Sequence, residues 1–323
     1  MVAYQRPESL AQILQVLASE KFDFICIAID GVDPKNVGAK ERNERIRRIA
    51  TDFHLKHTKL VQVIDRNENL GITLNFMKSV SLALTKVEYV CVLEDDCIPS
   101  PGFSLYLRSV VTLKVSESTK LYSLFRPNLS KVPRAAYYTH CPVMWGWMIS
   151  RESWVVVLND IQIQGRKSPL LTDYRFLYQG FLFSGFSRVV NGQKDAMDSL
   201  FAYIFLTCNY LALIPPINLI SNIGTGELAT NTKRNSFMFH TRAEIWSGED
   251  VSPSASLTSI RQSDFQIFSK MTGWKLHRTF SSYIKLRLTR PFSNPQGQID
   301  VRRAIAESLE VMASPIQQFK SLE

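Results

Sequence analysis

The sequence has 323 residues, of which 45% are hydrophobic and 21% are charged. This is the composition of an ordinary globular protein, and it excludes a disordered or fibrous chain. The formal net charge of +9 would suit nucleic acid, an anionic membrane surface or a phosphate-bearing substrate as partner. The longest basic run, formed by Arg45, Arg47 and Arg48, lies among glutamates in a helix pattern. We therefore expect a solvated helix face there and no nucleic-acid partner.

The cysteines and the hydropathy of the chain indicate its compartment. The cysteines are odd in number and widely spaced, and three of the five lie in apolar runs, as expected of buried thiols in a reducing compartment. The first residues lack the basic and then apolar layout of a signal peptide. No uncharged apolar stretch reaches the ~20 residues that a membrane-spanning helix needs. We expect a soluble, cytoplasmic protein with at most a peripheral membrane contact.

Strand and helix patterns alternate over residues 1–93. The predicted strands are 2–4, 22–29, 59–64 and 89–93. One predicted helix starts at Pro7, and two others cover 40–53 and 72–84. Strands that are separated by single helices indicate a parallel sheet with right-handed crossovers. Ligands bind to such sheets beyond the carboxyl ends of the strands. Asp30 and the triplet Glu94-Asp95-Asp96 follow two of these ends.

The pattern changes after two prolines, Pro99 and Pro101. The next predicted elements are a helix from about Phe103, a strand at 121–125, an apolar aromatic segment at 143–149, a helix at 195–209 and a strand at 211–214. From about Arg242 the pattern weakens into basic or amphipathic stretches. The predicted fold class is α/β, with a mostly parallel sheet flanked by helices and a less regular C-terminal helical region.

The acidic triplet is the most informative feature of the sequence. In an extended chain, side chains alternate between faces, so Glu94 and Asp96 share one face while Asp95 points away. Two carboxylates this close repel each other unless a cation or a proton lies between them. A divalent ion that prefers oxygen ligands, Mg²⁺ or Mn²⁺, fits that position. The structural alternative is a solvated acidic turn after a strand.

These residues carry a resemblance to a known family. The segment VCVLEDDCIPSPGF resembles the strand and acidic motif of the GT-A glycosyltransferases, whose usual forms include DxD and EDD. The likeness is to the bacterial family 2-type transferases and to the Golgi N-acetylglucosaminyltransferase that starts complex N-glycans. Further similar segments follow the same order along the chain: AYQRPESLAQILQVL, IAIDG, NENLGITLNFMKSV, MWGWMISRESW and PPINLISNIGTG. The resemblance extends from residue 2 to about residue 232.

The resemblance implies a GT-A (Rossmann-like) catalytic domain at residues 1–240, with a C-terminal extension at 241–323. Residues 1–100 would bind the nucleotide sugar and residues 101–240 the acceptor. The implied reaction moves a hexosyl or N-acetylhexosaminyl group, with inversion, from a nucleotide-diphosphate sugar to an acceptor hydroxyl. A UDP-sugar is the favoured donor, a glycan or another hydroxyl compound is the acceptor, and Mn²⁺ or Mg²⁺ is the cofactor.

The resemblance also assigns roles on the donor side. Asp96 would be the principal metal ligand, together with Glu94. Asp95 or Glu94 would contact the donor sugar or its ribose. Arg6 would hold the diphosphate or the base, and Asp30 would contact the uracil or the ribose. The structural alternatives are an ordinary surface arginine for Arg6 and a turn-forming aspartate before glycine for Asp30.

On the acceptor side, the resemblance points to Trp145, Gly146 and Trp147. Flat apolar rings suit the C–H faces of hexoses, and a glycine lets the backbone approach a ligand closely. The alternative for both tryptophans is a place in the core.

The general base is an aspartate early in a helix in the resembling families. Inverting transfer needs such a carboxylate to deprotonate the acceptor hydroxyl. Asp198 fits that place and Asp195 is its competitor. The bacterial relatives often have tryptophan before this aspartate, whereas Met197 stands here. The choice between Asp195 and Asp198 therefore stays open at this point.

Two other functions compete with glycosyl transfer. A nucleotidyltransferase on a related sheet would need a glycine-rich, basic signature after the first strand, and AYQRPESL contains no glycine. A non-catalytic sugar-binding module could retain the same fold. The intact carboxylates of Glu94, Asp95, Asp96 and Asp198 favour the enzyme.

Overall fold

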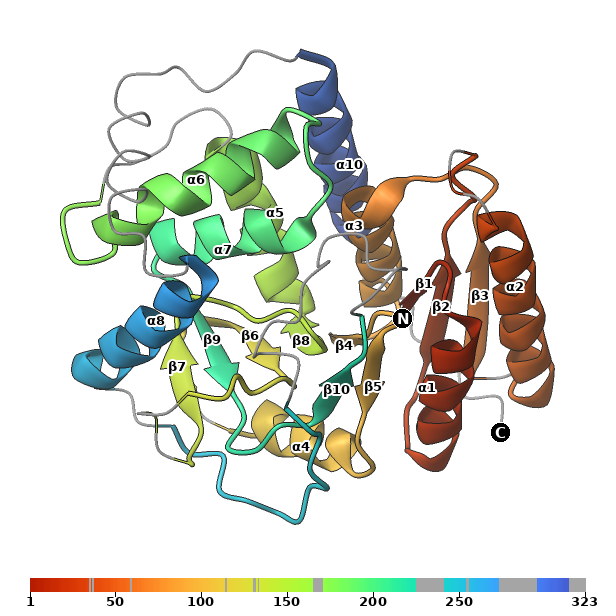
Figure 1. Cartoon of the computed structure of the whole chain (residues 1–323), viewed down its shortest axis with the longest axis horizontal. Helices are drawn as coiled ribbons and strands as arrows, with labels where there is room; N and C mark the ends of the chain where they lie inside the picture. Colours follow the sequence, from red (N-terminus) through yellow and green to blue (C-terminus); the bar gives the residue numbers. More distant parts are fainter. Residues whose placement is uncertain are drawn as a thin grey trace.

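The computed structural model describes residues 1–34, 36, 38–58, 60–113, 115–129, 132, 134–164, 171–224, 241–253, 256–272 and 295–313. These residues form an α/β fold in which helices flank one parallel and one mixed sheet (Figure 1). Strands β1–β3 with α1 and α2 form one side of the molecule, and α5–α8 lie on the other side.

The first sheet is parallel, as predicted. It contains β1 (Val2–Ala3), β2 (Ile25–Ile29) and β3 (Val61–Asp65) in the order β1-β2-β3, connected through α1 (Pro7–Ser19) and α2 (Ala39–Lys56). Pro7 begins α1 because the first helical position needs no N–H donor. The apolar stripe of α1, which includes Leu10 and Leu14, is fully buried.

The order in which strands are added to the sheet reverses after β3. After α3 (Gly71–Leu84), strand β4 (Tyr89–Val92) lies on the free side of β1, where Val2 forms a parallel bridge with Glu94. Because a crossover to a parallel strand is right-handed, this reversal puts α3 on the opposite face of the sheet from α1 and α2. The boundary between β1 and β4 is therefore the topological switch point of the sheet.

The second sheet is mixed, which corrects the prediction of a mostly parallel sheet. Its strands are β4, β8 (Trp147–Ser150), β6 (Thr119–Ser123), β9 (Leu211–Ile214) and β7 (Tyr137–Thr139), in that order. Only β6 and β9 pair in parallel; β8 runs antiparallel to both β4 and β6, and β7 runs antiparallel to β9. The alternation of one strand with one helix, on which the parallel prediction rests, ends at β4.

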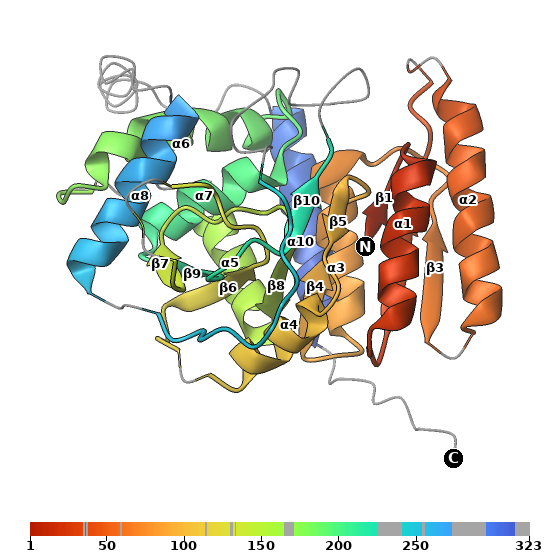
Figure 2. The same ribbon diagram turned by 60° about the horizontal axis from the view of Figure 1, so that its bottom comes forward.

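The structure is continuous across residue 100, and the division of binding roles at that residue stays a prediction. Strand β4 pairs with β8, and β5 (Cys97–Pro99) pairs with β10 (Ile220–Asn222) in a separate antiparallel ladder (Figure 2). Both ladders join residues before 100 to residues after it. The remaining helices are α4 (Phe103–Val111), α5 (Arg151–Gln164), α6 (Phe176–Val190), α7 (Met197–Thr207), α8 (Leu257–Thr272) and α10 (Pro295–Ala313).

The C-terminal helices are part of the same body. Helix α10 packs on α3 and α5, and the Lys78 ammonium lies 2.9 Å from a carboxylate oxygen of Glu307. Helix α8 packs on β7 through Asp264, whose side chain is fully buried. The Asp264 carboxylate accepts hydrogen bonds from the Thr139 hydroxyl, the His140 N–H and the Tyr174 hydroxyl, and its Oδ2 lies 2.7 Å from Nδ1 of His140.

Replacement of Asp264 should therefore loosen the C-terminal region. We expect Asp264→Asn to lower the free energy of unfolding by about 3–5 kcal/mol, because it leaves buried donors without their charged acceptor. Urea unfolding followed by circular dichroism measures this change. Asp300→Asn is the matched control, since its ion pair with Arg303 lies at the surface and should contribute less than about 1 kcal/mol. Equal unfolding midpoints for the two variants would contradict the anchoring role.

Candidate active site at the switch point of the sheet

Three chain segments meet at the carboxyl ends of the parallel strands. Arg6 follows β1, Asp30 follows β2, and the acidic triplet follows β4. The sheet reverses its strand order between β1 and β4, which is the position where parallel sheets of this kind bind their ligands. The sequence places polar and charged residues at this position, and the fold brings them together.

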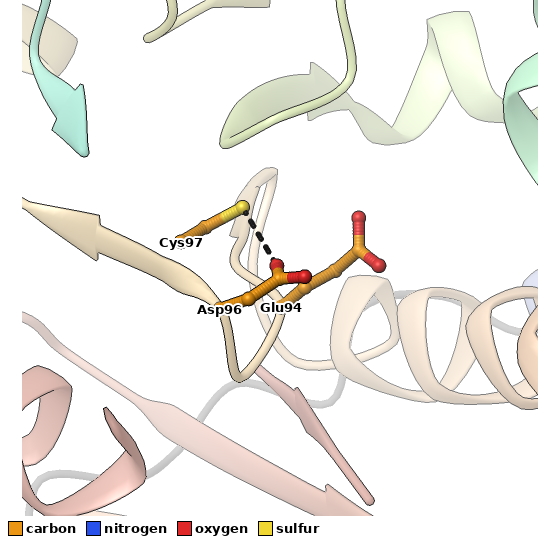
Figure 3. A group of neighbouring side chains, drawn as sticks. All are labelled: Glu94, Asp96 and Cys97. Carbon is orange, nitrogen blue, oxygen red and sulfur yellow. Dashed lines mark hydrogen bonds between the residues drawn. The ribbon is translucent and has the colours of Figure 1, made fainter. Parts of the chain in front are cut away.

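Glu94, Asp96 and Cys97 form a compact group at the end of β4. The chain turns there, and the N–H of Cys97 donates to the carbonyl oxygen of Glu94 at 3.1 Å. Figure 3 shows the two carboxylates and the thiol at this turn, with the thiol of Cys97 donating to Oδ1 of Asp96. One ligand atom from each of the three residues lies within 4.8 Å of the others. This closeness is what the shared face of Glu94 and Asp96 predicts, although the chain here is a turn and not an extended strand.

The electrostatics of this group favour a cation. Burial, followed by the negative charges of Asp96, Asp95 and Asp198, raises the pKa of the Glu94 carboxyl well above its usual range. Burial also raises the pKa of the Asp96 carboxyl, and the Arg6 guanidinium opposes that shift. Among the described residues, none donates a hydrogen bond to the Glu94 carboxylate. Bringing a divalent ion between these groups would remove their mutual repulsion.

The chemistry of the donor atoms indicates which cation fits. Two carboxylates are the oxygen ligands that Mg²⁺ and Mn²⁺ prefer. Burial and the neighbouring carboxylates of Asp96 and Glu94 hold the pKa of the Cys97 thiol well above its usual range. Since a thiol binds metals as its thiolate, Cys97 is a poor ligand in this state. Its hydrogen bond to Asp96 instead orients that carboxylate.

Asp95 points to the other side of the turn and holds the loop between β1 and α1. Its Oδ2 accepts hydrogen bonds from the N–H groups of Tyr4 at 2.8 Å, Gln5 at 3.0 Å and Arg6 at 3.3 Å. Oδ1 of Asp95 lies 2.9 Å from the Arg6 guanidinium. With 4% of the residue exposed, Asp95 is an internal anchor, and its oxygens are occupied by the protein itself.

Arg6 joins the anchor to the acidic group. Its NH1 nitrogen lies 2.9 Å from Asp95 Oδ1 and 3.4 Å from Asp96 Oδ2. The side chain is 15% exposed, so the guanidinium borders the site. A positive group beside a divalent-ion site is suited to a diphosphate.

Asp30 and Asp195 have a shared structural role at the start of α3. The carboxylate of Asp30 accepts hydrogen bonds from the N–H groups of Leu70 at 2.9 Å and Gly71 at 3.0 Å. The carboxylate of Asp195 accepts those of the next two residues, Ile72 at 2.6 Å and Thr73 at 2.8 Å. Four consecutive N–H groups at this helix start, which have no partner within the helix, are thus satisfied by two distant side chains.

Gly71 makes this arrangement possible. Its φ angle is 75°, in the left-handed region that favours glycine, and a Cβ atom at this position would collide with the Asp195 carboxylate. Burial raises the pKa of the Asp30 carboxyl, and the hydrogen bonds from Leu70, Gly31 and Gly71 oppose that shift.

Asp198 is placed differently from Asp195. It lies in the first turn of α7, is exposed, and accepts a hydrogen bond only from the adjacent Ser199 N–H among the described backbone donors, at 2.8 Å. Its negative charge is close enough to Glu94 to contribute to the raised pKa of that carboxyl. Both candidate bases are exposed, but the carboxylate of Asp195 is engaged at the start of α3, whereas the charge of Asp198 acts on Glu94.

The two tryptophans that were predicted to bind the acceptor lie in different environments. Trp147 is 1% exposed and packs against Trp154 and Phe201, with ring centroids 6.2 Å and 5.6 Å away. A side chain buried this deeply does not contact an acceptor. Trp145 is half-buried and makes an edge contact with Phe125 at 4.7 Å.

Gly146 is required by packing. Its φ angle is 72°, and a Cβ atom would lie 2.8 Å from the side chain of Ile220. This close approach brings β10 against the segment before β8. The need for glycine thus comes from a neighbouring strand of the protein.

The end of β10 completes the site, and the sequence patterns do not reveal its contacts. The N–H of Ile223 donates to the Asp96 carbonyl oxygen at 2.9 Å. The Asn222 amide donates to the Cys97 sulfur at 3.6 Å. A Cβ atom on Gly224 would collide with the Asp96 carboxylate. The segment PPINLISNIGTG indicates this region through the resemblance, but no spacing rule connects it to residues 94–97.

Comparison with protein-family models found no family that matches the chain, and comparison with the curated proteins found no similar sequence. No helix in the described ranges is long and apolar enough to cross a membrane. The arguments for function therefore rest on the geometry and the residues of the site.

Asp195, just before α7, and Asp198, in its first turn, allow a direct test of the capping role. We expect Asp195→Ala to lower the free energy of unfolding by about 1–2 kcal/mol, because two N–H groups at the start of α3 lose their acceptor. Asp198→Ala is the matched control and should change stability by less than about 0.5 kcal/mol, as a surface substitution does. Thermal and urea unfolding of both variants measure the difference. A larger loss for Asp198→Ala would show that the capping assignment is incorrect.

Proposed function

We propose that the protein is a metal-dependent glycosyltransferase with a GT-A-type fold, acting on a nucleotide-diphosphate sugar. The observation that carries the proposal is the Glu94 and Asp96 pair at the switch point of the sheet, with Arg6 beside it. This combination would supply a cation site and a fixed positive charge at the switch point, where such sheets bind nucleotides. The resemblance of the sequence to the GT-A transferases supports the same function independently.

Asp96 and Glu94 would hold Mn²⁺ or Mg²⁺. When bound, the ion neutralises the negative charge that develops on the leaving diphosphate. Arg6 supplies a second positive charge on the same side. Its contact with Asp95 fixes its position before a donor arrives, so little reorganisation is needed on binding.

The donor is a UDP-sugar in this proposal. Asp30 supports its binding indirectly, because it holds the turn of residues 69–71 against the end of β2. Asp95 supports it in a similar way by fixing the loop that carries Arg6. Both residues act as positioning residues, which refines the direct donor contacts expected from the resemblance.

Asp198 would be the general base. Its exposed carboxylate accepts the proton of the acceptor hydroxyl as the oxygen attacks the anomeric carbon from the side opposite the diphosphate, which inverts the configuration. Asp195 holds the start of α7 against α3 and so sets the position of Asp198. Trp145 is the aromatic side chain available for stacking on a glycan acceptor.

The products separate this reaction from its rivals. A glycosyltransferase releases a nucleoside diphosphate from the sugar donor, a nucleotidyltransferase releases pyrophosphate from a triphosphate, and a sugar-binding module releases neither. A panel of nucleotide sugars with Mn²⁺ and assorted hydroxyl acceptors therefore tests the proposal. Absence of diphosphate release across the panel, with the donors nevertheless bound, would favour the sugar-binding module.

Metal dependence gives the first test of the site. UDP should bind in the presence of Mn²⁺ and lose at least about tenfold in affinity, or 1.4 kcal/mol, when EDTA replaces the metal. Asp96→Asn should lose the metal-dependent part of the affinity, because one ligand oxygen and one negative charge are removed. Calorimetric titration measures both. Asp65→Asn is a control with an exposed carboxylate that pairs with Arg47. Equal UDP affinity in Mn²⁺ and in EDTA would contradict the metal site.

Turnover gives the second test. We expect Asp198→Asn to keep donor and metal affinity but to lower kcat by about 10²–10⁴-fold, the usual contribution of a general base. Asp195→Asn should destabilise the protein and reduce kcat much less at a temperature where it is folded. Initial rates of UDP release, with binding measured separately, distinguish the two variants. A larger loss of kcat for Asp195→Asn would identify Asp195 as the base.

A further inference from the structure

The carboxylate of Asp96 is held on both sides by neighbouring parts of the protein. On one side, the Cys97 thiol donates a hydrogen bond to Oδ1 at 3.3 Å. On the other side, Oδ2 lies 3.4 Å from the Arg6 guanidinium. The backbone at Gly224 also approaches Oδ2 closely, because a Cβ atom built there would collide with this oxygen. These contacts come from β5, from the loop after β1 and from the segment after β10, and they leave the carboxylate little freedom to rotate.

The Cys97 thiol has a second partner in Asn222, the last residue of β10. The Asn222 amide nitrogen donates to Sγ of Cys97 at 3.6 Å, a length that reflects the larger radius of sulfur. The orientation of this amide is fixed, because its oxygen accepts the Gly224 N–H at 2.8 Å. The sulfur therefore accepts from Asn222, and its own proton remains for Asp96. We call Asn222 and Cys97, together with the carboxylate that they orient, the thiol bridge.

The thiol bridge is built into the ladder of β5 and β10. Asn222 lies directly opposite Cys97 in that antiparallel pairing. Cys97 is fully buried, and only 8% of Asn222 is exposed. The ladder continues into the backbone of Asp96, whose carbonyl oxygen accepts the Ile223 N–H at 2.9 Å. Because hydrogen bonds are stronger where water is excluded, the orientation of the Asp96 carboxylate is set before a ligand arrives.

A carboxylate held in this way favours some cations over others. Since the thiol engages one oxygen of Asp96, the residue is suited to bind an ion through a single oxygen. Mg²⁺ demands near-ideal octahedral geometry with short ligand distances, and Mn²⁺ shares the preference for six oxygen ligands. Ca²⁺ takes more oxygen ligands at longer distances and often uses both oxygens of one carboxylate. A carboxylate that cannot turn both oxygens toward the ion therefore serves the smaller ions better.

We propose that Asn222 and Cys97 are positioning residues that make the cation site selective for Mn²⁺ or Mg²⁺ over Ca²⁺. This inference rests on the proposed function, because it takes Glu94 and Asp96 as the metal ligands. Neither positioning residue contacts the ion: Cys97 acts through its hydrogen bond to Asp96, and Asn222 acts through Cys97. Groups that orient a metal ligand from behind typically contribute about 10–100-fold to metal affinity.

Replacement of Cys97 tests the thiol bridge. Cys97→Ala removes the donor to Asp96 and should lower the affinity for Mn²⁺ by about 10–100-fold. The affinity for Ca²⁺ should fall less, so the ratio of the Mn²⁺ to the Ca²⁺ affinity should drop by about tenfold. Cys97→Ser supplies a hydroxyl donor at the same place and should retain the wild-type affinities and ratio. Cys208→Ala is the matched control, because Cys208 is a half-buried thiol at the end of α7.

Replacement of Asn222 tests whether β10 acts through the thiol. Asn222→Ala should lower the ratio of the Mn²⁺ to the Ca²⁺ affinity in the same direction as Cys97→Ala. In the Cys97→Ala background it should have no further effect on that ratio, because residues that act as one unit are not additive. Ser221→Ala is the control on the same strand. Its hydroxyl accepts the Ala243 N–H at 3.3 Å, so this variant perturbs β10 without altering the thiol bridge.

Electron paramagnetic resonance of free Mn²⁺ measures these affinities in the whole chain, with and without UDP, and displacement of Mn²⁺ by Ca²⁺ gives the ratio. Wild-type protein that binds no Mn²⁺ in either condition would contradict the cation site of the proposed function and this inference with it. Wild-type binding that Cys97→Ala leaves unchanged would overturn this inference alone. Equal losses in Cys97→Ser and Cys97→Ala would assign the effect to packing, and equal losses of Mn²⁺ and Ca²⁺ affinity would remove the selectivity.

Discussion

The carboxylate of Asp95 is the constraint on which the site depends. Strands β1 and β4 share only the bridge between Val2 and Glu94, so their ladder alone would not fix the loops that follow them. Asp95 closes this boundary with hydrogen bonds to three successive N–H groups and an ion pair to Arg6. One side chain thus joins the two sheets, sets the direction of α1 and positions the guanidinium beside Asp96.

The start of α3 is organised by the same principle. Asp30 comes from the end of β2 and Asp195 from the residues just before α7, and each accepts two N–H groups of the helix start. These contacts connect the nucleotide side of the proposed site with the helix that carries Asp198. The position of the exposed Asp198 carboxylate therefore depends on the contacts that Asp195, just before α7, makes with the start of α3.

Local patterns were sufficient for the first part of the fold and for the closeness of Glu94 and Asp96. The apolar runs at 22–29 and 89–93 correctly predict β2 and β4, and the triplet after β4 predicts the Glu94 and Asp96 group. The antiparallel insertion of β8 between β4 and β6 could not be predicted, because its apolar pattern is the same for either direction. The capping role of Asp195 could not be predicted either, since its acceptor contacts lie 122–123 residues away. Contacts of this kind depend on the packing of α7 against α3.

The hydrogen-bond state of each carboxylate separates the acids with structural contacts from those of the proposed site. Asp30, Asp95, Asp195 and Asp264 each accept hydrogen bonds on both oxygens from donors of the protein. A carboxylate in this state has its hydrogen-bonding capacity satisfied within the protein. Glu94 has no such donor among the described residues, and its pKa is raised by burial and by three neighbouring acids. Such an arrangement costs stability, and it is the feature on which the proposed cation site rests. The same reasoning explains why Asp95, the middle residue of the triplet, differs in role from its two neighbours.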